Sequence, residues 1–318
     1  MPKELINILF LGGAKRVSLA QHFIKSGLER GWNVSIFSYE LHADIPLSFI
    51  ATIIIGKKWN DPDILVDLEA VINRENIQIV IPSVDPATII ASKLKKHLKS
   101  ESFILATDDL KCEIFFHKQL TYNWAKLNGI PVPGDTLQFP MIAKPNNGSA
   151  SSGIVKITNE LEYEKFKKLN DISGYNIQQF INGREFSVDA YISIRNGNIV
   201  AIVPRERLEV LGGEAVKSIT IRDEQLISLS KEIITKSGLT GPVTIQFIRD
   251  NETNSNYLME INPRFGGAVL TSIGAGADFT GFVLDDFKGS QLKDQNESWK
   301  TGVMMIRYFS EFYRETLH

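Results

Sequence analysis

Short runs of Ile, Val, Leu and Phe alternate with longer amphipathic stretches between Leu5 and about Ala106. The apolar runs are Ile6–Leu11, Val34–Ser38, Ile53–Ile55, Ile77–Ile81 and Phe103–Ala106. Strands buried on both faces read as near-continuous apolar runs, and parallel strands need crossover connections that are usually helical. The pattern therefore predicts a parallel sheet with crossover helices, in an N-terminal α/β domain over residues 1–107.

The rhythm changes beyond this domain. Apolar residues at helical spacing fill residues 108–128 and stop before Gly129 and Pro131, which predicts a pair of linking helices. Strand-like segments then dominate and predict antiparallel pairing. They lie at 138–144, 153–157, 176–181, 185–194, 199–204, 243–248 and 257–261, with a helix at about 223–236 and a late strand at 302–309. We predict an α/β unit followed by an α+β unit over residues 108–318.

Composition narrows the class of protein. The 318 residues are 43% apolar and 23% charged, as in ordinary globular proteins. Lys and Arg number 35 against 37 Asp and Glu, for a formal net charge of -2, so no global positive field favours nucleic acid or anionic membranes. A single cysteine, Cys112, favours a reducing compartment, and no apolar run approaches the roughly 20 residues that span a bilayer. We expect a cytoplasmic protein with small-molecule substrates and without nucleic-acid or membrane partners, and a homodimer as the default assembly.

A lysine at the end of a predicted strand leads into a loop of small residues, Lys144-Pro-Asn-Asn-Gly-Ser-Ala-Ser-Ser-Gly153. The backbone N–H groups of such a loop can approach phosphate oxygens without obstruction by side chains. The lysine precedes the glycines, so this is not the Walker pattern. On these residues alone, a phosphate cradle and an ordinary hairpin loop remain equally open.

Three oxygen-bearing side chains, Gln246, Glu260 and Asn262, lie on two adjacent predicted strands. Glu260 and Asn262 are two residues apart and therefore share a face. A carboxylate with amide oxygens suits Mg²⁺, which takes oxygen ligands and keeps waters or substrate phosphates. Arg264 follows at once and can neutralise charge on a transferred phosphoryl group, although a structural salt bridge is the alternative for it.

Together these segments resemble the ATP-grasp superfamily. Gln246-Phe-Ile and Met259-Glu-Ile-Asn-Pro-Arg-Phe-Gly-Gly267 look most like the synthetase domains of the carbamoyl phosphate synthetase large subunit, and the resemblance covers about Asp108 to Asp286. It implies a pre-ATP-grasp domain, then an ATP-grasp fold with a mobile lid at about 131–181, and ATP with Mg²⁺ or Mn²⁺ as cofactors.

The resemblance also implies roles for individual residues. Lys118 and Lys144 would contact the ATP phosphates or the adenine edge, and Glu185 would bind the ribose. Gln246, Glu260 and Asn262 would be the metal ligands, with Arg264 and Lys144 catalytic. The lid loop would close on the phosphates through Ser149, Ser151, Ser152 and Gly153, and the adenine would meet the backbone of Gln179, Phe180 and Ile181. Gln179 departs from the acidic residue common at this hinge.

Two further segments are candidates for the acceptor side. Arg205 and Arg207, in a segment that the resemblance places among loops facing the acceptor, are candidate catalytic contacts to a carboxylate or phosphate; their alternative is pairing with neighbouring glutamates. The segment 11–16 follows a strand and opens a helix but lacks the full dinucleotide fingerprint. We therefore expect it, with residues 83–85, to line a crevice that helps to form the acceptor site.

The resemblance implies a carboxylate–amine ligase that forms ADP and an acyl phosphate and then joins the acyl group to an amine. Two alternatives stay open at this point. One is phosphoryl transfer to a small carboxylate, as in carbamoyl phosphate synthetase, although this chain has room for a single synthetase unit. The other is an ATP-binding sensor module without catalysis.

Overall fold

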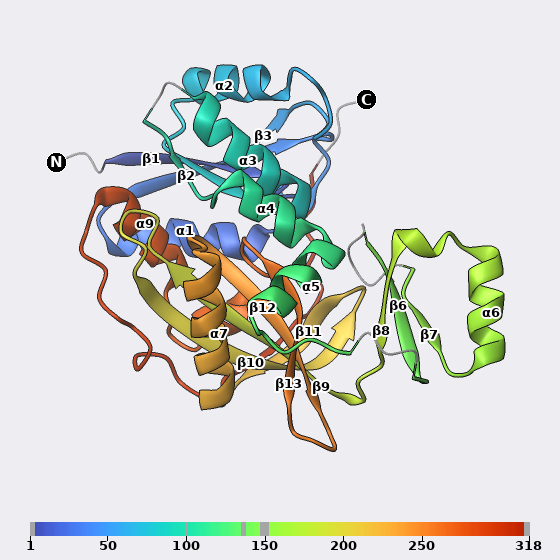
Figure 1. Ribbon diagram of the computed structural model, residues 1–318. Helices are drawn as coiled ribbons and strands as arrows, with labels where there is room; N and C mark the ends of the chain where they lie inside the picture. The colour runs from blue at the N-terminus through green and yellow to red at the C-terminus, as the bar shows by residue number, and fades with distance from the viewer. Residues whose placement is uncertain (1–3, 99–100, 135–137, 147–152, 315–318) are drawn as a thin grey trace.

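The computed structural model describes residues 4–98, 101–134, 138–146 and 153–314. The N-terminal part is a parallel sheet (Figure 1). Its strands, in order across the sheet, are β3 (Thr52–Ile55), β2 (Asn33–Glu40), β1 (Leu5–Leu11), β4 (Ile79–Pro82) and β5 (Phe103–Ile104). Its helices are α1 (Val17–Glu29), α2 (Ile64–Arg74) and α3 (Asp85–His97), with a short 3-10 turn, η1 (Pro46–Phe49). The predicted parallel α/β unit is confirmed.

The central strand β1 supplies both faces of this sheet. Ile8 and Phe10 pack in one core cluster with α1, whereas Leu9 and Leu11 pack in another with α2 and α3. Successive side chains of a strand point to opposite faces, so a fully apolar strand feeds two cores. This explains why the sequence of β1 reads as a continuous apolar run.

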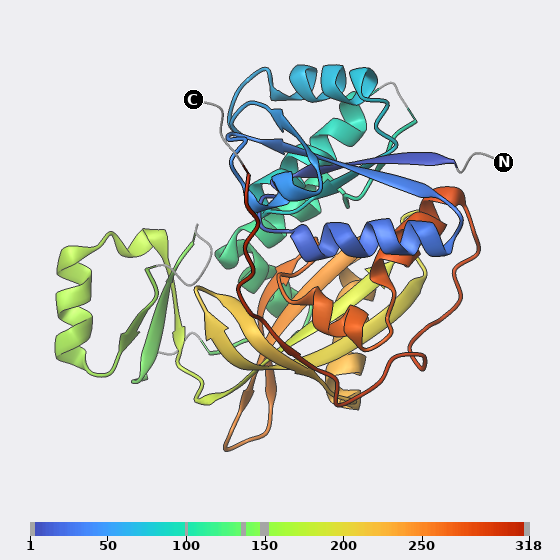
Figure 2. The same cartoon turned by 180° about the vertical axis from the view of Figure 1, so that it is seen from behind.

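The second unit is built on a large antiparallel sheet. In order across the sheet, its strands are β13 (Asn256–Asn262), β12 (Gly241–Asp250), β9 (Gly183–Ile192), β10 (Ile199–Leu211), β11 (Glu214–Thr220) and β14 (Met304–Ile306). One face packs against α4 (Asp109–Phe116), α5 (Lys118–Leu127) and α7 (Glu224–Ser237). The other face, with α8 (Val269–Gly274) and α9 (Phe279–Lys288), shares a core with α1 and β1 (Figure 2). The N-terminal sheet therefore packs on the large sheet through α1 and α9 (Figure 1 and Figure 2).

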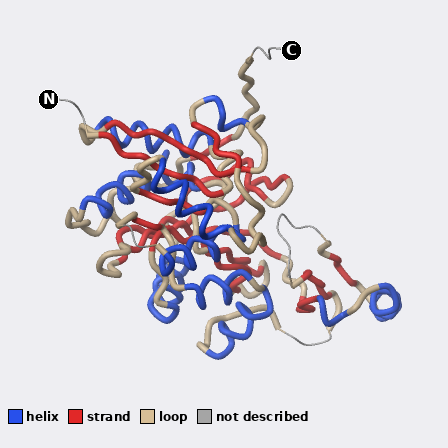
Figure 3. Tube along the Cα trace, turned by 90° about the horizontal axis from the view of Figure 1, so that it is seen from above, coloured by secondary structure: helices blue, strands red, loops and turns tan. Residues whose placement is uncertain are grey.

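A small sheet lies to one side of these two units (Figure 3). Its strands are β7 (Val155–Ile157), β6 (Met141–Pro145) and β8 (Tyr175–Gln179), and α6 (Glu160–Leu169) and the turn η2 (Ile172–Gly174) complete it. Phe166 of α6 is buried against Met141 and Ala143 of β6. The small sheet thus has a core cluster of its own. It falls within the residues that the sequence predicts as the lid.

Some elements differ from the sequence predictions. The segment around Arg205 and Arg207, predicted to be loops, belongs to a long β10–β11 hairpin whose turn is Gly212-Gly213, with φ of 57° and 78°. Glycine adopts such positive φ at little cost. The two glycines were therefore interpreted as part of a loop, although they form the turn of a hairpin. The late strand is shorter than predicted, and the helices α6, α8 and α9 were not predicted. Among the described residues, no helix is long and apolar enough to cross a membrane.

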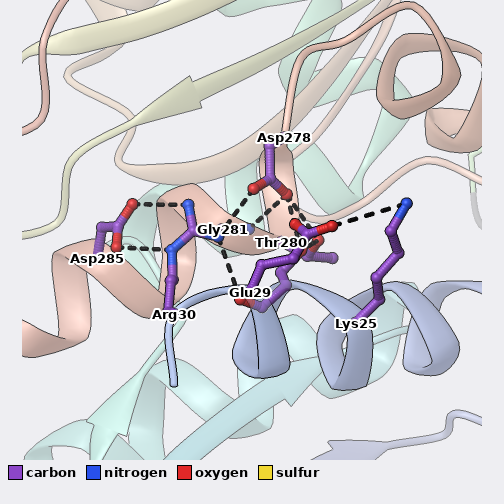
Figure 4. A network of polar contacts seen from close by, with 8 residues as sticks. Lys25, Glu29, Arg30, Asp278, Thr280, Gly281 and Asp285 are labelled. Atoms are coloured by element: carbon purple, nitrogen blue, oxygen red, sulfur yellow. Dashed lines mark hydrogen bonds and ion pairs between the residues drawn. The ribbon is translucent and has the colours of Figure 1, made fainter. Parts of the chain in front are cut away.

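A network of polar contacts joins α1 to α9 (Figure 4). The Arg30 guanidinium donates from Nε and Nη2 to both carboxylate oxygens of Asp285, each over 2.8 Å, and from Nη1 to Asp278 over 3.0 Å. Asp278 also caps α9 by accepting from the backbone N–H of Gly281. These hydrogen bonds to the ionised carboxylates of Asp285 and Asp278 raise the pKa of Arg30. The bidentate geometry fixes the helix of the N-terminal unit on the second unit.

We expect Arg30→Ala to lower the free energy of unfolding by about 1–3 kcal/mol, because hydrogen bonds to charged groups are lost. Lys25→Ala is the matched control, since the Lys25–Glu29 pair on the same helix is exposed and should be worth less than about 0.5 kcal/mol. Urea unfolding of both variants measures the difference. Equal destabilisation of the two variants would contradict this role of Arg30.

Candidate active site

The three predicted metal-ligating side chains lie together on β12 and β13. The strand register pairs Gln246 with Glu260, and Asn262 follows two residues later on the same face. The Asn262 side-chain amide donates to Glu260 Oε1 over 2.6 Å. The amide side chains of Gln246 and Asn262 thus flank the Glu260 carboxylate on one patch of the large sheet.

This donor set has the chemistry of a magnesium or manganese site. Among the described residues, no group of three or more His, Cys, Asp or Glu side chains is placed to hold a metal ion. A cation at this patch would therefore combine Glu260 with amide oxygens and non-protein ligands. Gln246 Oε1 accepts from Arg207, and Asn262 Oδ1 accepts from Arg264 over 3.3 Å. Each amide oxygen has a second lone pair, so the residues fit such an ion.

Gln246, Glu260 and Asn262 form the candidate metal patch. Arg207 links this patch to Glu185, the candidate ribose-binding residue. Its guanidinium donates to Gln246 Oε1 over 2.5 Å and to the carbonyl of Gly213 over 2.8 Å, and lies 3.3 Å from Glu185 Oε2. Burial lowers the pKa of Arg207, and the Glu185 carboxylate opposes that shift. Arg207 therefore contacts two of the other candidate site residues, and its predicted contact to a substrate stays a prediction.

Lys144 ends β6 and is 7% exposed. Its ammonium nitrogen is 3.3 Å from Gln178 Oε1 and 3.8 Å from the sulfur of Met259. Burial lowers the pKa of Lys144 to about 8; the charge of Glu260 opposes this shift, and that of Lys118 adds to it. Lys118 and Lys144 line one pocket, between α5, β6, β8 and β13. Two lysines from separate elements thus converge beside the metal patch.

The predicted hinge connects β8 to β9. The backbone N–H groups of Gln179 and Phe180 donate to the carbonyls of Gly134 and Pro140, over 2.7 and 3.0 Å. These two N–H groups are therefore already hydrogen-bonded within the protein. Contacts between adenine and the other backbone groups of this segment, including those of Ile181, stay a prediction. The ammonium of Lys156 lies 3.8 Å from the centroid of the Phe180 ring.

The small-residue loop is described only at its ends. Ser149, Ser151 and Ser152 lie outside the described residues, so their predicted phosphate contacts stay predictions. Gly153 has φ of 73°, and a Cβ at this position would lie 2.9 Å from the Pro145 side chain. Glycine is thus required where the loop enters β7, whichever ligand the loop meets.

Arg264 connects the metal patch to the N-terminal unit. Its Nε donates to Asp85 Oδ1 of α3 over 2.5 Å, while Nη1 donates to the carbonyl of Phe265. Its Nη2 is the group that donates to Asn262. The salt bridge that the sequence left as an alternative is present, and the same guanidinium also reaches a candidate metal ligand. Asp85 lies in the segment predicted to line the crevice.

Arg205 lies in the core and is 2% exposed. Its Nε donates to Asp189 Oδ2 over 2.8 Å, and Asp189 also accepts from the hydroxyls of Thr244 and Ser272, over 2.9 and 2.7 Å. This position favours the structural alternative for Arg205, with a partner on β9 in place of the neighbouring glutamates. Arg205 and Arg207 share a face of β10 but have different partners, because Arg205 lies beside Asp189 whereas Arg207 lies near Gln246 and Glu185.

The glycine loop after β1 is already occupied by a carboxylate of the chain. Glu40, at the end of β2, accepts from the Ser38 hydroxyl over 2.6 Å and from the backbone N–H groups of Gly13 and Ala14. Burial raises the pKa of Glu40, while these hydrogen bonds lower it. The loop's amides are therefore used internally, which agrees with the prediction that this is not a dinucleotide site.

Comparison with known proteins finds similarity to one family. A family model described as "ATP-grasp in the biosynthetic pathway with Ter operon" matches residues 175–311. The D-alanine–D-alanine ligase of Petrotoga mobilis is 27% identical over 203 residues, which are 55% of this chain and 66% of that protein. Residues 175–311 are thus similar to the ATP-grasp superfamily. The match thus spans just under two thirds of the curated relative.

Solved structures agree on the fold. The biotin carboxylase domain of the Hydrogenobacter thermophilus 2-oxoglutarate carboxylase, in complex with MgADP and bicarbonate, aligns with a TM-score of 0.74 at 14% identity over 94% of this chain and 73% of its own. N5-carboxyaminoimidazole synthetase from Staphylococcus aureus with ADP aligns with a TM-score of 0.72 at 19% identity, over 92% of this chain and 80% of its own. The L-amino acid ligase from Bacillus licheniformis aligns with a TM-score of 0.67 at 18% identity, over 90% of this chain and 75% of its own.

These comparisons confirm the resemblance to the ATP-grasp superfamily and the mixed fold predicted from the sequence. The prediction of an ATP-grasp enzyme of the ligase type agrees with the relatives, of which two are named as ligases. The finer placement beside the carbamoyl phosphate synthetase large subunit stays a prediction, as do the domain boundaries and the roles of single residues.

We expect Arg205→Ala to destabilise the protein by about 3–5 kcal/mol, because it leaves the buried Asp189 carboxylate without its cation. Arg184→Ala is the control, since Arg184 is half exposed, pairs with Glu206 over 3.7 Å and should cost less than about 1 kcal/mol. Denaturant unfolding measures both. An Arg205→Ala variant with unchanged stability would restore Arg205 as a candidate substrate contact.

Proposed function

We propose that this protein is a magnesium- and ATP-dependent ligase that activates a small-molecule carboxylate as an acyl phosphate and joins it to an amine. The observation that carries the proposal is the convergence of Lys144, on β6, with Glu260 and Arg264, which lie four residues apart on β13 and just after it. Lys144 lies close enough to Glu260 for that charge to act on its pKa, and Arg264 donates to the neighbouring Asn262. One carboxylate for a cation is thus flanked by two cationic groups, as transfer of a phosphoryl group requires.

In the first step, an oxygen of the substrate carboxylate forms a bond to the γ-phosphorus of ATP as the bond to the β-phosphate oxygen breaks, which gives ADP and an acyl phosphate. Lys118 and Lys144 would bind the phosphates, and Glu260, Gln246 and Asn262 would hold Mg²⁺. When bound, this ion neutralises charge on the phosphate oxygens. Arg264 would orient the carboxylate for in-line attack.

In the second step, the nitrogen of the amine bonds to the acyl carbon, inorganic phosphate leaves with the former carboxylate oxygen, and the amine loses a proton. The small sheet would act as the lid that excludes water from the acyl phosphate. The products are an amide, ADP and phosphate.

We expect Glu260→Gln to lower magnesium-dependent release of ADP by at least about 100-fold, because the only carboxylate of the patch is lost. The matched control is Glu252→Gln, the same change at an exposed position in the turn between β12 and β13. Release of ADP is measured with amino acids supplied singly and in pairs.

The pattern of release separates the candidate reactions. Release that needs two amino acids and is lost in Glu260→Gln supports ligation. Release with a single acid and formation of a phosphorylated product would replace ligation by phosphoryl transfer. Tight binding of ATP without release across the panel would contradict a catalytic role.

We expect the affinity for ADP to fall as the pH rises above about 8. The pKa of Lys144 is lowered to about 8, so the ammonium that attracts phosphate is lost above this pH, and bound phosphate should raise that pKa again. Lys144→Arg keeps its charge and should show a flat profile over the same range. Calorimetric titration from pH 7 to 9.5 tests this, and identical profiles for both proteins would contradict it.

A further inference from the structure

Three arginines from distant segments surround the loop that follows the metal patch. Arg16, which precedes α1, donates to the carbonyl of Gly266 over 3.3 Å, and Arg264 donates to that of Phe265 over 3.1 Å. Arg307, which follows β14, donates to the carbonyl of Gly267. The three guanidinium groups are thus held on three consecutive carbonyl groups.

The carboxylates of this cluster do not balance its charge. Asp85 pairs with Arg264, and Glu214 pairs with Arg307 over 2.8 Å. Arg16 has carbonyl acceptors only, on Gly266 and Ser83, and among the described residues no carboxylate forms an ion pair with it. Three cations and two anions leave one positive charge in excess.

The environment of Arg16 reflects this imbalance. Burial and the charges of Arg264 and Arg307 together lower the pKa of Arg16 to about 10, whereas the charges of Glu214 and Asp85 raise it. The cationic form of Arg16 is thus less favourable here than in water, and a bound anion would stabilise it.

Two buried polar atoms beside the cluster have no partner among the described residues. One is Arg307 Nε, and the other is the hydroxyl of Ser83, whose carbonyl accepts from Arg16 over 3.1 Å. An unmet buried donor costs free energy that an oxygen ligand can restore. One edge of the cluster is accessible to solvent, because the side chains of Arg307 and Glu214 are 32% and 46% exposed.

We propose that Arg16 and Arg307 form a second anion subsite, so that the substrate of the proposed ligase carries a carboxylate or phosphate group besides the carboxylate that is activated. This inference rests on the proposed function. Arg264 serves the reacting carboxylate because it also contacts Asn262, whereas Arg16 and Arg307 bind the loop farther along, at Gly266 and Gly267. The spacing of the two groups selects a substrate with anions at both ends.

Matched probes test the subsite without knowledge of the natural substrate. Binding in the presence of MgADP is measured by calorimetry for glutarate and adipate, for pentanoate and hexanoate as monocarboxylates of the same lengths, and for ω-phosphonocarboxylates of these lengths. We expect the wild type to bind at least one dianion about tenfold or more tightly than its monoanionic counterpart. Preference for the carboxylate or the phosphonate series identifies the second anion.

The variants are Arg16→Gln and Arg307→Gln, with Lys25→Gln as the control because Lys25 is exposed on α1. We expect each arginine variant to lose the preference for the dianion by about tenfold, Arg16→Lys to recover part of it, and the control to keep it. Thermal unfolding checks that each variant is folded. Equal binding of dianions and monoanions by the wild type, no binding of any dianion, or a preference unchanged in Arg16→Gln would overturn the subsite.

The outcomes for the subsite and for the ligase are separable. Dianion binding that depends on Arg16, without release of ADP from ATP in any mixture, would uphold the subsite and contradict the ligase. Release of ADP that is indifferent to the second anion would uphold the ligase and contradict the subsite.

Discussion

The antiparallel pairing of β12 with β13 is the constraint on which the candidate site depends. Its register sets Gln246 opposite Glu260 and brings Asn262 to the same face. Both strands are anchored through β9, whose Phe186, Val188 and Ala190 are buried against α7. A slip of one residue would turn every side chain of a strand to the other face, so the packing of this apolar face fixes the polar face as well. The apolar packing on one face of the large sheet thus fixes the positions of the polar side chains on its other face.

Charge pairing organises the rest of the site. Asp189 binds Arg205 in the core. Glu185 and Gln246 bind Arg207 farther along the same face of the large sheet. Arg264 bridges the two units through Asp85. Partners of this kind position long side chains before a ligand arrives, so less conformational entropy is lost on binding. Arg16 has carbonyl acceptors only, and it is the arginine of this site for which we infer an anionic ligand.

Sequence reasoning recovered what periodicity and motif spacing encode. The parallel sheet follows from its continuous apolar runs, and the shared face of Glu260 and Asn262 follows from their spacing. It missed the β10–β11 hairpin because two consecutive glycines at its turn read as a loop. It also missed Asp189 as the partner of Arg205 and Glu40 as the partner of the glycine loop, because each contact joins strands whose register is set by tertiary packing. Arg16 was visible in the sequence, but its convergence with Arg307 depends on chain segments almost 300 residues apart.

The central claim is that ATP activates a carboxylate as an acyl phosphate. Its most direct test is to supply a carboxylate that supports ADP release, labelled with ¹⁸O in both carboxylate oxygens, and to analyse the released phosphate by mass spectrometry. The account predicts that one labelled oxygen appears in the phosphate for each turnover, because that oxygen bridges carbon and phosphorus in the intermediate. Phosphate without label, at an undiminished rate of ADP release, would contradict it.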